Sequence, residues 1–140
     1  MKIIDTTTYF EEKLMMNLRF NILNSQVDHF IVCEARFTHS GKSKDINFKK
    51  TDYPNFANKI THLIIDKEPN DIIKKEKLEP QELRFNSVAR IRAQRDYIME
   101  ALNDYSPDDY LIYSDNDEIP NLEFFDFNKN KDKIILFKQR

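Results

Sequence analysis

The chain has 140 residues, and 40% of them are hydrophobic, which is enough to build the core of one ordinary domain. Its 22 basic and 24 acidic residues give a net charge of −2, so the charge balance favours neither nucleic acid nor an anionic membrane surface as a partner. The single cysteine, Cys33, lies in an apolar run, which fits a buried thiol in a reducing compartment and excludes a disulfide framework. We therefore expect one domain that spans residues 1–140.

Two absences narrow the possible functions further. No apolar run approaches the ~20 residues that a membrane-spanning helix needs, and the N-terminus becomes charged too soon for a signal peptide, which favours a soluble cytoplasmic protein. Only one glycine, Gly41, is present. The glycine-rich loops of Rossmann and P-loop proteins need several glycines for close backbone approach to phosphate, so neither loop is expected.

The first third of the chain predicts a strand, a helix and a second strand. Residues 2–5 predict a short strand that ends at Asp5, and Thr8 with Glu11 fits a capping box at the start of the following helix. Residues 27–34 are almost continuously apolar and predict a strand buried on both faces, which ends at Glu34. Apolar residues at every fourth position predict the buried face of the helix: Phe10, Leu14, Leu18 and Ile22.

The rest of the chain continues the alternation. Polar, basic residues predict a surface loop over 36–50, and a further strand over 59–66 ends at Asp66. After a charged loop over 67–82, the spacing of apolar residues predicts a long helix over 83–102. Residues 110–114 and 133–138 predict a fourth and a fifth strand.

Strands that alternate with helices predict an α/β fold with an open, mostly parallel sheet flanked by helices. Ligands of such sheets bind beyond the carboxyl ends of the strands. Four acidic residues are predicted to lie at that edge, although an acid at a strand end is equally common as a helix cap: Asp5, Glu34, Asp66 and Asp115.

Three acids follow the fourth strand within residues 115–118. Asp115 and Asp117 have the Asp-x-Asp spacing, which in a turn directs two carboxylates to one side and suits a hard cation such as Mn²⁺ or Mg²⁺. A diphosphate can supply the remaining ligands, so the pattern favours a nucleotide-sugar donor. A solvated turn whose acids cap a helix is the alternative. A calcium loop of the EF-hand kind is disfavoured, because Pro120 stands where that loop needs glycine.

Residues 114–120, with the sequence Ser-Asp-Asn-Asp-Glu-Ile-Pro, resemble the signature of glycosyltransferase family 17, which contains β-1,4-mannosyl-glycoprotein β-1,4-N-acetylglucosaminyltransferase. Other segments match the family's motifs in the same order. They are Phe10, Glu12 and Arg19 in the first helix, residues 27–34, the Ser-Gly-Lys sequence at 40–42, and Gln94 with Arg95.

The resemblance implies a GT-A type fold, a UDP-sugar donor such as UDP-N-acetylglucosamine, a divalent metal and transfer to a glycan acceptor with inversion. It implies that Asp117 is the principal metal ligand, and that Asp115 contacts the metal or the ribose. Arg95 would face the donor phosphates and Glu34 would lie near the nucleotide. With Asp5, these residues form the expected donor site; a salt bridge of Arg95 with Asp96 or Glu100 and a capping role for Glu34 are the structural alternatives.

The chief departure from the family concerns length. Family members continue well past the Asp-x-Asp segment into a part expected to bind the acceptor, whereas this sequence ends at Arg140. We expect the sheet to be incomplete at its C-terminus, and the general base of an inverting transfer to lie outside this chain. Exposed apolar residues between 122 and 137 favour a homo-oligomer. Two other functions remain open, namely a non-catalytic nucleotide-binding or assembly module and a nucleotidyltransferase.

Overall fold

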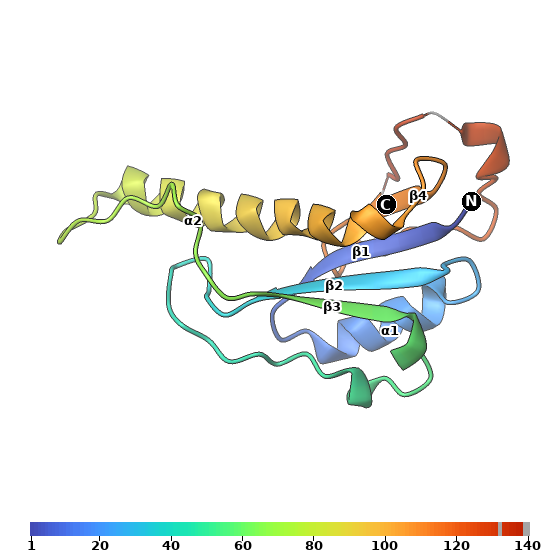
Figure 1. The fold of residues 1–140 in the computed structure, drawn as a ribbon, viewed down its shortest axis with the longest axis horizontal. Helices are drawn as coiled ribbons and strands as arrows, with labels where there is room; N and C mark the ends of the chain where they lie inside the picture. Colours follow the sequence, from blue (N-terminus) through green and yellow to red (C-terminus); the bar gives the residue numbers. More distant parts are fainter. Residues whose placement is uncertain (132, 139–140) are drawn as a thin grey trace.

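The fold is a four-stranded, all-parallel sheet with the strand order β3-β2-β1-β4, covered by helices on both faces (Figure 1). The computed structural model describes residues 1–131 and 133–138. The α/β class expected from the alternation is confirmed, and it is consistent with a GT-A-like fold. The strands are β1 (Ile3–Tyr9), β2 (His29–Ala35), β3 (Ile60–Ile65) and β4 (Tyr110–Tyr113).

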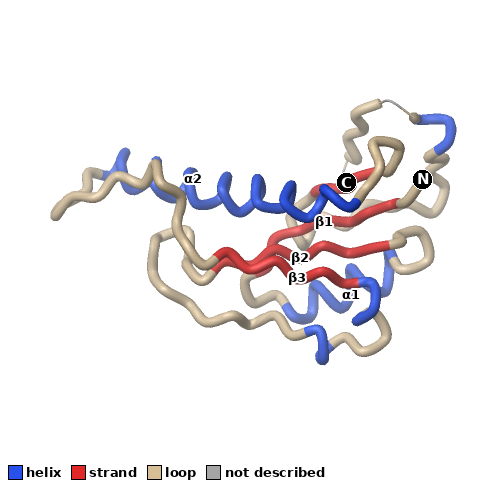
Figure 2. The backbone as a smooth tube through the Cα atoms, in the orientation of Figure 1, coloured by secondary structure: helices blue, strands red, loops and turns tan. Residues whose placement is uncertain are grey.

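The helices and short 3-10 turns connect these strands, except for one 3-10 turn that follows β4 (Figure 2). The two α-helices are α1 (Lys13–Leu23) and α2 (Pro80–Asp96), and α2 continues into the 3-10 helix η3 (Tyr97–Asp104). The predicted helix over 83–102 therefore begins earlier and changes to the 3-10 form where it was expected to remain α-helical. Three short 3-10 turns are also described: η1 (Lys50–Asp52) and η2 (Ala57–Lys59) precede β3, and η4 (Asn128–Asn130) follows β4.

The sheet separates two apolar cores, because successive side chains of a strand point to opposite faces. On one face Phe30 and Val32 of β2 pack with Phe20 of α1. On the other face Ile31 and Cys33 pack with Ile98 of η3. Burial raises the pKa of the Cys33 thiol to about 12, so the thiol stays protonated at neutral pH.

The buried face of α1 differs from the predicted one. Met16, Arg19, Phe20 and Leu23 are buried, whereas the predicted apolar stripe faces solvent, with Leu14 82% exposed. The helix carries two apolar stripes, and the one with Met16, Phe20 and Leu23 faces the core. Arg19 is buried beside this stripe, where Asp5 supplies a partner for its guanidinium. The predicted capping box is wrong too, since Thr8 belongs to β1 and the Glu12 carboxylate accepts hydrogen bonds from Phe10 N and Glu11 N.

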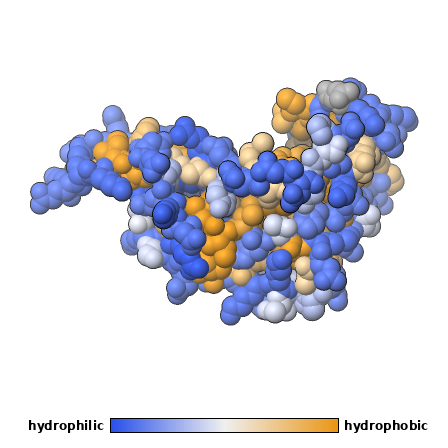
Figure 3. Space-filling view, in the orientation of Figure 1, coloured by the Kyte–Doolittle hydropathy of each residue, from blue (hydrophilic) through white to orange (hydrophobic). Residues whose placement is uncertain are grey.

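The α2 helix also turns polar residues toward the interior. Its buried face is polar and carries Asn86, Arg90 and Gln94, while Leu83 and Val88 are more than half exposed. The N-terminal part of α2 projects beyond the sheet, and apolar atoms lie exposed along it (Figures 1 and 3). Because the strands do not reach this part, its polar face meets the backbone of neighbouring loops instead of an apolar core.

The predicted fifth strand is not formed. Residues 133–138 are described but pair with no strand, and Ile134 and Leu136 are 98% and 91% exposed. Strand β4 is therefore the edge of the sheet among the described residues. No helix among the residues that the structure describes is long and apolar enough to cross a membrane.

Candidate functional site

A cleft of about 540 Å³ lies where the strand order reverses, at the carboxyl edge of β1 and β4. In an open parallel sheet, connections leave this point in opposite directions, and the crevice between them is where ligands bind. Its walls come from the end of β1, the start of α1, the loop after β2, the C-terminal part of α2 and the turn after β4. Residues lining the cleft include Phe10, Met15, Gln94, Arg95, Asp115 and Asp117.

The two predicted metal ligands lie together on the turn that follows β4. A hydrogen bond of 3.0 Å from Glu118 N to Asp115 O closes this turn. Both Asp115 and Asp117 are exposed and line the cleft. The Asp117 carboxylate makes no hydrogen bond or ion pair with any described residue, so its oxygens are free to bind an external ligand.

Arg95 reaches the same turn from α2. Its Nη2 lies 3.2 Å from Asp115 Oδ1, and its guanidinium carbon lies 5.6 Å from the centre of the Tyr113 ring. Both charged side chains are about half exposed. The partner of Arg95 is therefore Asp115 and neither Asp96 nor Glu100, the two partners considered from the sequence. The positively charged guanidinium of Arg95 therefore lies beside the acidic turn and is accessible from the cleft.

Asp5 lies beneath this site instead of at its surface. The predicted strand end is wrong, because β1 continues to Tyr9 and places Asp5 in the middle of the strand. The carboxylate is 1% exposed, and its two oxygens accept hydrogen bonds of 2.7 and 2.8 Å from Arg19, which is 0% exposed. Asp5 thus reaches the cleft only through Arg19, a residue that we identified by its motif but did not place in the site.

Glu34 is also fully buried and holds a loop. Its carboxylate accepts hydrogen bonds from Lys44 Nζ at 2.6 Å, Asn47 N at 2.8 Å and Phe48 N at 3.0 Å, and His62 Nε2 lies 3.3 Å away. Burial alone would raise the pKa of the Glu34 carboxyl, but these partners lower it to about 2. Glu34 thus anchors the loop after β2 without capping the 3-10 helix that follows, and its contact with a nucleotide stays a prediction.

The Ser-Gly-Lys segment forms a tight turn against α2. Gly41 adopts φ +85°, and a Cβ at this position would overlap the Arg90 guanidinium. Arg90 is paired with Glu68 and donates a hydrogen bond of 3.1 Å to His39 O. Because His39 lines the cleft, Arg90 fixes the wall that faces the acidic turn.

The donor set at the turn fits a hard divalent cation. Asp115 and Asp117 offer carboxylate oxygens, which are the ligands that Mg²⁺ and Mn²⁺ prefer. Among residues 1–131 and 133–138, no group of three or more His, Cys, Asp or Glu side chains is close enough to hold a metal alone. Two carboxylates in an open cleft suit a cation whose other ligands come from a bound diphosphate, as Mg²⁺ is usually held.

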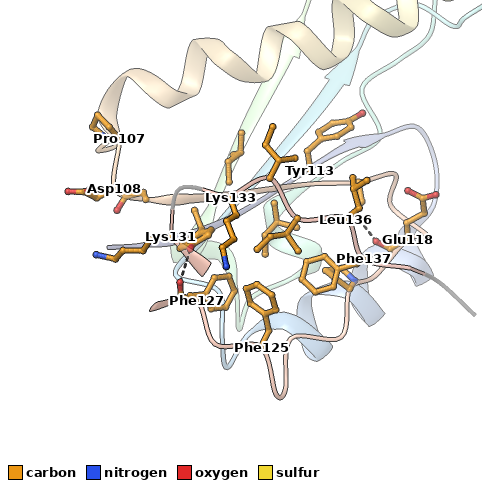
Figure 4. A pocket seen from close by; sticks show the side chains of 18 residues that line it. Pro107, Asp108, Tyr113, Glu118, Phe125, Phe127, Lys131, Lys133, Leu136 and Phe137 are labelled. Atoms are coloured by element: carbon orange, nitrogen blue, oxygen red, sulfur yellow. Dashed lines mark hydrogen bonds between the residues drawn. The ribbon is translucent and has the colours of Figure 1, made fainter. Parts of the chain in front are cut away.

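A second cavity of about 760 Å³ lies beside β4, between that strand and the C-terminal segment (Figure 4). The rings of Phe125, Phe127 and Phe137 gather on one side of it, with Phe125 in edge-on contact with both of the others. None of the five predicted site residues lines this cavity. We therefore assign the smaller cleft as the candidate site, despite the larger volume beside β4.

The parallel sheet, the cleft at its switch point and the acidic turn define an open α/β protein with a candidate ligand-binding crevice. The family model for glycosyltransferase family 17 matches residues 1–136, so the chain belongs to that family. The resemblance noted from the motifs is thereby confirmed. Membership makes this a glycosyltransferase family protein, with a sugar donor and a glycan acceptor as its substrate classes. No curated protein and no solved structure matches the chain.

Proposed function

We propose that the cleft binds a UDP-sugar, with N-acetylglucosamine as the expected sugar, for metal-dependent transfer to a glycan acceptor with inversion. The observation that carries the proposal is the presence of Asp115, Asp117 and Arg95 together in the lining of the cleft. Two carboxylates and one guanidinium suit a metal–diphosphate unit, because the carboxylates hold the cation while the guanidinium contacts phosphate oxygens.

Apolar residues of the same cleft support a nucleoside. Phe10 and Met15 contribute apolar surface there, and Phe10 is 42% exposed. A flat aromatic ring offers a nucleobase a surface for stacking. Apolar side chains beside charged ones in the lining match a nucleoside diphosphate better than an inorganic anion.

In the proposed reaction, the acceptor hydroxyl oxygen forms a bond to the anomeric carbon while the bond from that carbon to the diphosphate oxygen breaks. The acceptor proton passes to a general base. A bound cation would neutralise charge that develops on the diphosphate. Asp115 and Asp117 would hold this cation, and Arg95 would stabilise the same charge by charge-assisted hydrogen bonds.

Turnover and competition measurements test the proposal. We expect the protein to bind UDP-N-acetylglucosamine in the presence of Mn²⁺, and to release UDP when a suitable glycan is added. Binding without turnover over a panel of nucleotide sugars and glycans would favour the non-catalytic module. Tighter binding of a nucleoside triphosphate than of UDP, with release of pyrophosphate, would favour a nucleotidyltransferase. Absence of binding by any of these nucleotides would refute the proposed function.

A further inference from the structure

The buried side chain of Arg19 makes direct contact with the backbone of the acidic turn. Its Nη1 lies 3.0 Å from Asp115 O, 3.5 Å from Asn116 O and 3.3 Å from Glu118 O. These carbonyl groups surround the peptide units that carry the two predicted metal ligands. One guanidinium group therefore contacts three of the four backbone carbonyls in the turn at residues 115–118.

The other nitrogens of Arg19 fix the guanidinium itself. Nε and Nη2 donate to the two oxygens of Asp5, and Nη2 also donates to Ser114 Oγ at 2.7 Å. The Ser114 hydroxyl in turn donates to Glu118 O at 2.7 Å. Asp5 lies in β1, an inner strand, so this network ties the turn to the centre of the sheet.

Only arginine can satisfy this arrangement. Its planar fork presents five N–H donors, whereas lysine has one compact ammonium group on a flexible stem. Arg19 is 0% exposed and is not among the residues that line the cleft, so it is not placed to contact substrate. Its charge is balanced by Asp5, which leaves the Nη1 group to the turn carbonyls.

We propose that Arg19 is a positioning residue that holds Asp115 and Asp117 in the geometry required for cation binding, with Asp5 as its anchor. The inference rests on the proposed function for the identity of the ligand, but the conformation of the turn can be measured without any ligand. Groups that orient metal ligands from behind typically change metal affinity by about 10-fold to 100-fold when they are removed.

The test compares Arg19→Lys with Phe20→Leu, which also alters the buried face of α1 but touches no part of the turn. We expect Arg19→Lys to fold, to speed amide hydrogen exchange at residues 115–118, and to weaken Mn²⁺ binding in the presence of UDP by about 10-fold or more. Binding is measured from the electron paramagnetic resonance signal of free Mn²⁺. Phe20→Leu should lower stability and leave both readouts unchanged at the same folded fraction.

A second variant covers the case in which Arg19→Lys does not fold. Ser114→Ala removes one partner of Arg19 and one bond to Glu118 O, and we expect a smaller change in the same direction in both readouts. Wild-type exchange at residues 115–118 in the folded variants would overturn the proposal, as would equal effects of Phe20→Leu. If the wild type binds no Mn²⁺ with UDP, the proposed function fails, while the exchange measurement still decides the role of Arg19.

Discussion

Arg95 and Asp115 form an ion pair of 3.2 Å between the C-terminal end of α2 and the turn after β4. The pair joins two segments that the sequence places 20 residues apart, and it lies in the wall of the cleft. Since both side chains are about half exposed, water screens their attraction, and the pair itself contributes little to stability. Arg95 is therefore available to exchange Asp115 for the phosphate oxygens of a ligand.

Replacement of Arg95 by glutamine should weaken nucleotide binding more than it weakens folding. We expect the affinity for UDP with Mn²⁺ to fall about 10-fold, since a charged hydrogen bond to phosphate is lost, while the affinity for uridine stays unchanged. Isothermal titration calorimetry measures both ligands. Arg84→Gln, on the same helix and exposed but outside the cleft, is the matched control. An equal loss for uridine and UDP would argue against a phosphate contact.

Glu34 should make stability depend on pH in the acid range. The pKa of its carboxyl falls from an ordinary value of 4.5 to about 2 in the folded chain, because the nearby His62 ring and hydrogen bonds from Asn47, Lys44 and Phe48 outweigh the effect of burial. A folded-state pKa below the unfolded one means that the stabilisation is complete above pH 4.5 and is lost as the pH falls toward 2.

The corresponding experiment uses Glu34→Gln in urea denaturation. We expect a loss of about 2–3 kcal/mol at pH 7, with the difference from wild type shrinking as the pH falls from 4.5 toward 2. Glu123→Gln changes an exposed carboxylate and should show neither effect. A difference between wild type and Glu34→Gln that stays constant across this range would contradict the assigned ionisation.

Gly41 should tolerate no side chain while Arg90 is in place. Alanine at this position adopts the positive φ of 85° with strain and also overlaps the guanidinium, so we expect Gly41→Ala to cost about 1 kcal/mol or more. Thermal denaturation of the two single variants and of Gly41→Ala with Arg90→Ala gives a double-mutant cycle. The cost of Gly41→Ala should be smaller in the Arg90→Ala background, and strict additivity would rule out the steric explanation.

The polar face of α2 should matter more for stability than its apolar face. Asn86 accepts a hydrogen bond from Ile73 N at 2.8 Å and donates one to Ile73 O at 2.9 Å, and it is 1% exposed. Asn86→Ala would leave these backbone groups unpaired, with an expected loss of roughly 2 kcal/mol. Val88→Ala, at a 55% exposed site, should stay within roughly 0.5 kcal/mol of wild type. Urea midpoints that rank the two variants in the opposite order would disprove this assignment.

The spacing of apolar residues predicted the positions of the strands and helices better than it predicted which helix faces are buried. The strands over 27–34 and 59–66 correspond closely to β2 and β3, because continuous apolar runs are hard to place elsewhere than in a buried sheet. The buried face of α1 was predicted wrongly, since this helix buries Arg19 and exposes Leu14, and α2 likewise buries an arginine while Leu83 is exposed. Spacing cannot reveal that an arginine has an acidic partner waiting in a strand far along the chain.

For the candidate site, too, the sequence predicted some features and missed others. Local spacing predicted Asp115 and Asp117, and the motif order predicted Arg95; all three meet in one cleft. Asp5 and Glu34 were predicted at the ligand edge, but their buried contacts depend on Arg19 and on the loop after β2. The available signal was the single arginine between Met16 and Phe20, an expensive residue to bury without a partner.

The most direct test of the central claim is the binding of UDP-N-acetylglucosamine to the wild type and to Asp117→Asn, measured by calorimetry with and without Mn²⁺. Asparagine preserves the size of the side chain and removes the charge that would hold the cation. We predict Mn²⁺-dependent binding to the wild type, and a loss of that dependence in Asp117→Asn, while Asp108→Asn, outside the cleft, behaves as wild type. Equal Mn²⁺-dependent binding by wild type and Asp117→Asn would contradict the account.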